Sequence, residues 1–136
     1  MEVVLDVNVF VSAVLSGAGP SAALVAAMRD GRLSAVASSR LLIELRDVLR
    51  RDRFRPYLSH EEVDEYVVEL EGLCRIVDDP RAVPKVVRDP DDDYLVALAS
   101  EAATSAIVSG DLDLREAVGL PVEVLTPREA LVRLSQ

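Results

Sequence analysis

The sequence predicts an α/β fold of three layers, in which helices cover both faces of a central, mostly parallel sheet of five strands. Five short apolar, β-prone runs alternate along the chain with segments whose apolar residues recur at helical spacing. Helix-capping signals stand at several of the boundaries between them. Strands that alternate with helices form right-handed βαβ units, which build a parallel sheet covered on both faces.

The first half of the chain supplies two of the strands. Residues 2–7 form an apolar run that is typical of a strand, and helical stretches follow at about 8–16 and 20–30. "LSAVAS" (33–38) is a second short strand. Residues 39–52 are predicted to form an amphipathic helix, because apolar side chains recur along it at helical spacing. These side chains are Leu41, Leu42, Leu45, Val48 and Leu49.

The middle of the chain has clear helix start signals. "SHEE" (59–62) is a capping box, and it opens a helix that we expect to end near Leu73. Residues 74–78, "CRIVD", are a third strand candidate. Pro90 stands at a first helical position and is followed by three acids, so the next helix begins there.

The last part of the chain completes the sheet. "SAIVS" (105–109) and "VEVL" (122–125) are the fourth and fifth strands. "TPRE" (126–129) combines an N-cap, proline at the first helical position and glutamate at the third, so a final helix runs to near the end. In such sheets ligands bind beyond the carboxyl ends of the strands, at a switch in strand order.

Composition narrows the class of protein. The chain has 136 residues, which fits one domain over residues 1–136. Its formal net charge of −9 counts against a simple DNA-binding module, because such modules take most of their affinity from a basic surface. No apolar run reaches membrane-spanning length, so we expect a soluble, cytoplasmic protein without a membrane partner. Cys74 and His60, each the only residue of its type, are interpreted as structural or incidental and not as functional.

Carboxylates follow two of the predicted strands at the edge where a ligand is expected. Asp6 comes at the end of the first strand, and Asp111 and Asp113 follow the fourth. One acid after a strand is common, because aspartate favours turns and caps. Acids after two strands of one parallel sheet are a stronger signal, since a charge at the edge of a core is costly unless it is paired, hydrated or bound to a cation.

Two helices offer further acids. Glu44 lies at the margin of the apolar stripe of its helix, where it either pairs in solvent with Arg40 or Arg51 or leans over the sheet edge. Residues 91–93 are aspartates in the first turn of a helix that is apolar nearly all round, so the start of this helix is held close to the same edge. Periodicity does not decide which of the three faces inward.

A group of carboxylates of this size favours metal-assisted chemistry. Four or five of them around one cleft repel one another, so either some stay protonated near neutral pH or a cation lies among them. The chain has no Ser–His pair, because His60 stands alone in a polar segment. Ligation by oxygen alone suits Mg²⁺ or Mn²⁺ and not zinc, and such ions favour phosphoryl transfer.

These residues resemble the motifs of PIN-domain nucleases, in order, over almost the whole chain. "LDVNVFVSA" is similar to the opening of that family, with Asp6, Asn8 and Ser12 in place and Val7 where threonine is usual. Three later motifs each supply an acid. They are Glu44 in "SSRLLIELRDVL", Asp93 in "RDPDDDYLVALA", and Asp111 or Asp113 after Ser109 in "IVSGDLDL".

The resemblance implies an endoribonuclease that depends on Mg²⁺ or Mn²⁺ and often forms a homodimer. We expect its RNA substrate to be single-stranded, because an active site at the edge of a sheet needs an accessible backbone. The "GAGP" turn and the "DPDDD" run are similar to the toxins of toxin–antitoxin pairs, the VapC-like endoribonucleases, and so imply an antitoxin protein as partner. The implied metal ligands are Asp6, Asp93, Glu44 and Asp111, with Asp113 as a further ligand or the true fourth acid. The implied hydrogen-bonding residues around them are Asn8, Ser12 and Ser109.

A group of arginines has two interpretations. Arg46, Arg50, Arg51, Arg53 and Arg55 lie close together in the sequence. They are either a solvated helix end, where cations favour the helix dipole, or a rim that contacts phosphates. In the second case Arg46, Arg50 and Arg51 would contact RNA.

Two other functions are compatible with parts of the pattern. A haloacid-dehalogenase-like phosphatase also places aspartate after the first strand and uses a lysine, here Lys85, but it needs a second aspartate where this chain has Asn8. The other alternative is a non-catalytic PIN-like domain kept for binding. Titration with a metal separates them, because an inert binding domain has no reason to bind Mn²⁺.

Overall fold

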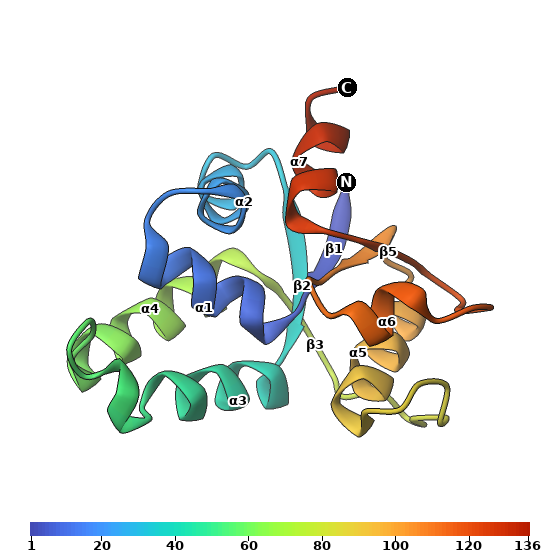
Figure 1. Cartoon of the computed structure of the whole chain (residues 1–136), viewed down its shortest axis with the longest axis horizontal. Helices are drawn as coiled ribbons and strands as arrows, with labels where there is room; N and C mark the ends of the chain where they lie inside the picture. The colour runs from blue at the N-terminus through green and yellow to red at the C-terminus, as the bar shows by residue number, and fades with distance from the viewer.

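The computed structural model describes residues 1–136 and confirms the predicted three-layer α/β architecture (Figure 1). Five strands form one parallel sheet in the order β3-β2-β1-β4-β5. The strands are β1 (Glu2–Leu5), β2 (Ser34–Ser38), β3 (Arg75–Val77), β4 (Ala106–Val108) and β5 (Glu123–Leu125). The helices are α1 (Val7–Ser16), α2 (Pro20–Arg29), α3 (Ser39–Leu49), η1 (Asp52–Phe54), α4 (His60–Leu73), α5 (Pro90–Glu101), α6 (Leu112–Glu116) and α7 (Pro127–Leu134).

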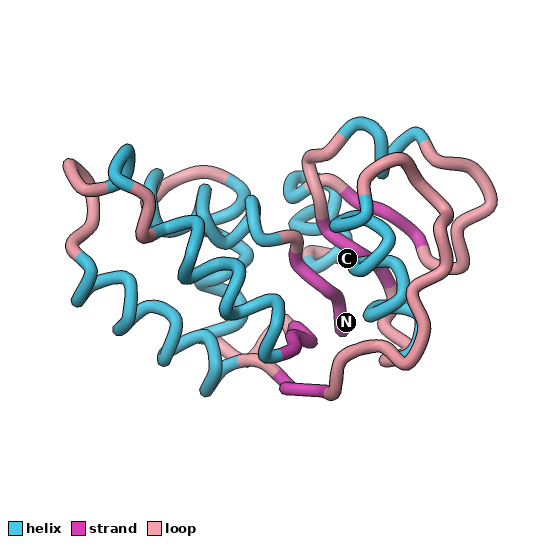
Figure 2. The backbone as a smooth tube through the Cα atoms, turned by 90° about the horizontal axis from the view of Figure 1, so that it is seen from below, coloured by secondary structure: helices cyan, strands magenta, loops and turns pink.

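The helices divide between the two faces of the sheet. Helices α1 to α4 lie on one side, and α5 and α6 lie on the other, as Figure 1 shows. Helix α7 packs against α2 and β5. Figure 2 gives the same layers from below, with the long helices of one layer side by side. No single helix is long and apolar enough to cross a membrane; α1 and α2 meet that test only together, as a pair bent by 95°.

The strand order switches between β1 and β4. From β1 the chain builds outward to β2 and β3, then returns to place β4 and β5 on the other side of β1. Leu5 is paired with Val108, so the next residues, Asp6 and Ser109, leave the sheet at the same level. The Asp6 N–H donates to the Val108 carbonyl at 3.0 Å, which extends the ladder to this point. This junction is where a parallel sheet binds its ligands.

The core holds this junction rigidly. It contains 37 buried residues, and β1 contributes Val3, Val4 and Leu5 with no exposed area. A strand buried on both faces is apolar throughout, which explains why β1 has no alternation. Helix α5 is buried from Asp92 to Ala99, so its first turn lies against the carboxyl edge of the sheet. Each large apolar side chain buried in full stabilises the fold by about 1.5–3 kcal/mol.

Several element boundaries differ from the sequence prediction. The first strand ends at Leu5 and not at residue 7, because the Asp6 side chain caps α1 by accepting a hydrogen bond from the Asn8 N–H. The helix predicted over 39–52 ends at Leu49 and is followed by the short 3₁₀ helix η1. Helix α6 was not predicted. The capping boxes at residues 59–62 and 126–129 are both confirmed.

Candidate metal centre

Asp6 is buried at the junction of β1 and β4. The residue is 8% exposed, and its Oδ2 accepts a hydrogen bond from the Ser109 hydroxyl at 2.8 Å. Oδ1 accepts the Asn8 backbone N–H at 3.3 Å. Burial raises the pKa of Asp6, and the hydrogen bond from Ser109 opposes that shift. The strand pairing therefore fixes this carboxylate, with Ser109 as its partner.

Asp92 is the most perturbed acid at this edge. It is 4% exposed, and its Oδ2 is buried without a hydrogen-bond partner. Carboxylate oxygens of Asp89, Asp92 and Asp111 all lie within 4.8 Å of one another. Burial raises the pKa of Asp92 to about 7, and contact with Asp111 and the charges of Asp89 and Asp6 add to the shift. A buried oxygen without a donor among like charges calls for a shared proton or a cation.

Local capping brings these acids together. Asp89 is the N-cap of α5 and Asp111 is the N-cap of α6, so both side chains stand at helix starts that face the sheet edge. Asp111 accepts the Asp113 N–H at 2.9 Å, and its own N–H donates to Ser109 at 3.0 Å. Ser109 thus links Asp6 to the turn that carries Asp111.

Glu44 faces the same group from the opposite side. It is half-buried on α3, and burial raises its pKa, followed by the charges of Asp91 and Asp6, whereas Arg40 lowers it. The sequence left open whether Glu44 pairs in solvent or leans over the sheet edge. Its interactions with two acids of this region favour the second interpretation. We refer to the following residues as the acidic cluster: Asp6, Glu44, Asp89, Asp92 and Asp111.

Asp93, which the motif comparison singled out, is placed differently. It is buried, but its Oδ1 accepts the backbone N–H groups of Val86 and Val87 at 2.8 and 2.9 Å. Successive residues of a helix point about 100° apart, so Asp92 and Asp93 cannot both face the acidic cluster. The structure gives the inward position to Asp92, and Asp93 holds the segment that precedes α5.

Three other expected site residues lie outside the acidic cluster. The Asn8 side chain is exposed, and the residue contributes its backbone N–H to Asp6. Ser12 is exposed further along α1, where it lines a surface depression together with Arg128 of α7. Asp113 is exposed and lines another depression beside Arg88. Between the two candidate acids after β4, the geometry favours Asp111.

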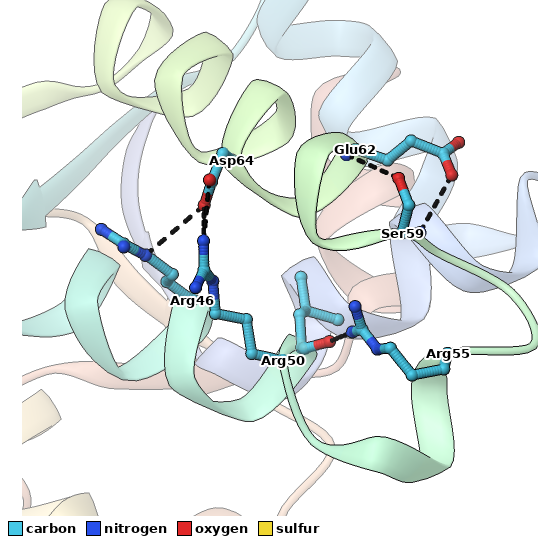
Figure 3. A network of polar contacts seen from close by, with 7 residues as sticks. Arg46, Arg50, Arg55, Ser59, Glu62 and Asp64 are labelled. Atoms are coloured by element: carbon cyan, nitrogen blue, oxygen red, sulfur yellow. Dashed lines mark hydrogen bonds and ion pairs between the residues drawn. The ribbon is translucent and has the colours of Figure 1, made fainter.

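The arginines at the end of α3 mostly hold the fold (Figure 3). Arg50 reaches both carboxylate oxygens of Asp64 on α4 at 2.7 Å, and Arg46 lies 3.5 Å from the same group. Arg55 donates to the Leu49 carbonyl at the end of α3. Arg51 is exposed and forms no ion pair. These contacts favour the interpretation as a helix end over that as a phosphate rim.

Replacing the shared acid of this network tests its role. Asp64→Asn is expected to lower the melting temperature slightly, because it removes the charge that Arg46 and Arg50 share in a partly exposed setting. The interpretation as a phosphate rim instead predicts that the same change alters binding of RNA. Thermal unfolding and an RNA-binding titration distinguish the two interpretations. Weaker or stronger RNA binding by Asp64→Asn would show that these arginines contact phosphates.

Cys74 and His60, each the only residue of its type, lie outside the acidic cluster. Cys74 is buried at the end of α4, and burial raises the pKa of its thiol to about 11. A thiol in such surroundings is unreactive. His60 is exposed at the start of α4. The position of Cys74 agrees with a structural role, and the exposed His60 is an incidental surface residue.

The residues present fit a hard divalent cation. The donors are all carboxylate oxygens, which Mg²⁺ and Mn²⁺ prefer. The unpartnered, buried Oδ2 of Asp92 is a ligand position that no donor of this chain satisfies. Asp89 was missed as a site residue, because an aspartate directly before a proline-initiated helix is an ordinary N-cap, and its side chain does cap α5 by accepting the Asp91 N–H.

Comparison with known proteins places the chain among its relatives. A family model described as PIN domain matches residues 2–113. An uncharacterized protein of Methanocaldococcus jannaschii is 25% identical over 114 residues, which are 84% of this chain and 73% of that protein.

Two solved structures have a similar fold. A chain of VapBC2 from Rickettsia felis, crystallised with a DNA fragment from its promoter, is 12% identical with a TM-score of 0.62, and the match covers 93% of this chain and 98% of that one. PAE2754 from Pyrobaculum aerophilum is 14% identical with a TM-score of 0.65, with 98% and 88% covered. At these identities the likeness concerns the fold. Because the family model spans most of the sequence, including Asp6, Glu44, Asp92 and Asp111, the chain belongs to the PIN domain family.

Proposed function

We propose that this chain is a divalent-metal-dependent endoribonuclease that cleaves single-stranded RNA and acts as the toxin of a toxin–antitoxin pair. The observation that carries the proposal is the acidic cluster at the strand-order switch, with a buried Asp92 oxygen that has no donor. Membership of the PIN domain family supports nuclease activity. The fold likeness to VapBC2 supports the toxin role and an antitoxin as partner.

The residues of the acidic cluster and Ser109 have distinct roles in this proposal. Asp6, Asp92 and Asp111 would hold Mg²⁺ or Mn²⁺, with Glu44 and Asp89 completing the set directly or through water. A bound divalent ion supplies positive charge that neutralises the scissile phosphate and polarises the attacking water. Ser109 keeps Asp6 in position by donating to its Oδ2, as residues that orient metal ligands do.

Asp93 takes the role of a positioning residue in this proposal. By accepting two backbone N–H groups it fixes residues 86–87, and these lead directly into the turn that carries Asp89. An active site at the edge of a sheet needs an accessible backbone in its substrate, which favours single-stranded over duplex RNA. A cytoplasmic location and a homodimer belong to the same proposal.

A cleavage assay tests this function. The purified chain is incubated with labelled single-stranded RNA and with duplex RNA, in Mn²⁺, in Mg²⁺ and in EDTA. We expect cleavage of the single strand in either ion, loss of cleavage in EDTA and recovery when the ion is restored. Asp6→Asn, prepared in parallel, controls for contaminating nuclease. A chain that binds Mn²⁺ but cleaves neither RNA would contradict the proposal and favour the non-catalytic alternative.

A further inference from the structure

Arg40 stands between the two helices that carry most of the acidic cluster. It is the second residue of α3, one turn before Glu44. Its guanidinium lies over the ring of Tyr94 on α5, 4.1 Å from the ring centroid. The contact therefore connects α3, which carries Glu44, with α5, whose first turn carries Asp92. Glu44 lies four residues further along α3, so the two side chains are neighbours on the helix surface.

The ring under Arg40 is a fixed platform. Tyr94 is 3% exposed, and its hydroxyl donates to Asp79 at 2.6 Å and shares a hydrogen bond with the buried Ser38 hydroxyl. Ser38 in turn caps α3 by accepting the Leu41 N–H. Stacking of a guanidinium on an aromatic ring uses its flat face and leaves the N–H donors at its edge available. No sequence pattern predicts this contact, because its partners lie far apart along the chain.

Those donors have no partner within the chain. The Arg40 side chain is exposed and forms no hydrogen bond and no ion pair within 4.0 Å, not even with Glu44. In contrast, Arg29, Arg50, Arg75 and Arg133 each bind a carboxylate at 2.7–2.8 Å. A cation that is held in place but not neutralised, beside a cluster that repels anions, is suited to bind an anionic ligand.

We propose that Arg40 binds a backbone phosphate of the single-stranded RNA that reaches the acidic cluster. This inference rests on the proposed function and adds the residue that attracts the substrate to an otherwise negative surface. The guanidinium edge matches the geometry of two phosphate oxygens. Because the Tyr94 ring already orders the side chain, less conformational entropy is lost when RNA binds.

The test measures RNA binding apart from cleavage. Labelled single-stranded RNA of mixed sequence is titrated with full-length Asp6→Asn protein, followed by fluorescence anisotropy at several salt concentrations. Adding Arg40→Gln is expected to weaken binding about tenfold, because a charge-assisted hydrogen bond is lost, and to reduce the slope of log K against log[salt] by about 0.7. Arg32→Gln removes the same charge from an exposed position shortly before β2, at the opposite edge of the sheet, and is the matched control.

Two further variants separate charge from stacking. Arg40→Lys should keep the salt slope but bind more weakly, since an ammonium does not stack on Tyr94 or bind two oxygens in parallel. Tyr94→Leu should weaken binding without any change of charge, and circular dichroism checks that it folds. If Tyr94→Leu is unfolded, the two Arg40 variants still decide the question.

The outcomes are distinct from those of the nuclease proposal. Equal affinity and salt slope for Arg40→Gln and Arg32→Gln would overturn the inference, as would a parent protein that binds no RNA. Binding that depends on Arg40 in a wild-type chain that cleaves no RNA would support it and overturn the nuclease proposal. If the wild-type chain cleaves RNA but the Arg40→Gln variant binds RNA as tightly as its parent, the nuclease proposal is supported and the inference is overturned. If an acidic peptide binds in place of RNA and depends on Arg40, the ligand is a protein partner and the inference fails.

Discussion

Asp92→Asn is expected to reduce metal-dependent RNA cleavage by about 100-fold or more, whereas Asp93→Asn is expected to cleave at a rate close to wild type. Asp92 has a buried oxygen without a donor among the acids of the cluster, so the amide removes a ligand charge. A metal supplies several kcal/mol of charge stabilisation, and each 1.36 kcal/mol is tenfold in rate. Single-turnover cleavage in saturating Mn²⁺ measures both variants.

The Asp93 variant is a close control because it lies next in sequence and is equally buried. The amide oxygen of asparagine still accepts the two N–H groups of Val86 and Val87, so the segment before α5 stays in place. Asp93→Ala removes both hydrogen bonds and should lower thermal stability as well as activity. If Asp93→Asn abolished cleavage and Asp92→Asn did not, the motif comparison would be right and the assignment from geometry wrong.

The contrast between these neighbours shows what the sequence could not predict. Helix α5 is buried nearly all round, so no apolar stripe fixes which of its first-turn acids faces the sheet edge. The partners of Asp93 are backbone N–H groups, which carry no sequence signal. Only the packing of α5 against β1 and β4 sets its rotation.

Local signals, in contrast, were sufficient for most of the fold. The capping boxes that begin at Ser59 and Thr126 involve neighbours in the chain, and both form as predicted. The meeting of Asp6 with the turn after β4 follows from parallel pairing, which the alternation of strands and helices implies. Helix α6 was missed because five residues are too short to show a helical period.

The sequence also could not predict which charged side chains pair when they lie far apart along the chain. Arg50 and Asp64 lie on different helices, and nothing in either segment marks them as partners. The sequence alone therefore leaves two interpretations for the run of arginines. Its spacing offers Arg40 only as a solvent partner for Glu44, whereas in the structure Arg40 stacks on Tyr94.

In the metal-free protein, the contribution of Asp92 to the free energy of unfolding is expected to fall as pH rises from about 4 to 7. The pKa of Asp92 is about 7 in the folded chain, against an ordinary value of 3.8. Between these values the folded state holds a proton that the unfolded state has released, so raising the pH favours unfolding. Asp92→Asn should remove this penalty and melt above wild type at pH 8, with no such gain at pH 4. Asp113→Asn, which removes an exposed charge, is the control.

In the presence of Mn²⁺ at pH 8, wild type is instead expected to melt above Asp92→Asn. The cation binds ionised carboxylates, so its stabilising effect grows over the same pH range in which Asp92 loses its proton. At about 100 times its dissociation constant, an ion that binds only the folded state contributes about 2.7 kcal/mol, which is roughly 10 °C in melting temperature for a domain of this size. Wild type should gain this at pH 8 and little at pH 5, and Asp92→Asn should gain little at either pH. Differential scanning calorimetry measures all four values. An equal gain by both proteins at pH 8 would show that Asp92 is not a ligand and that the cation binds elsewhere on the acidic surface.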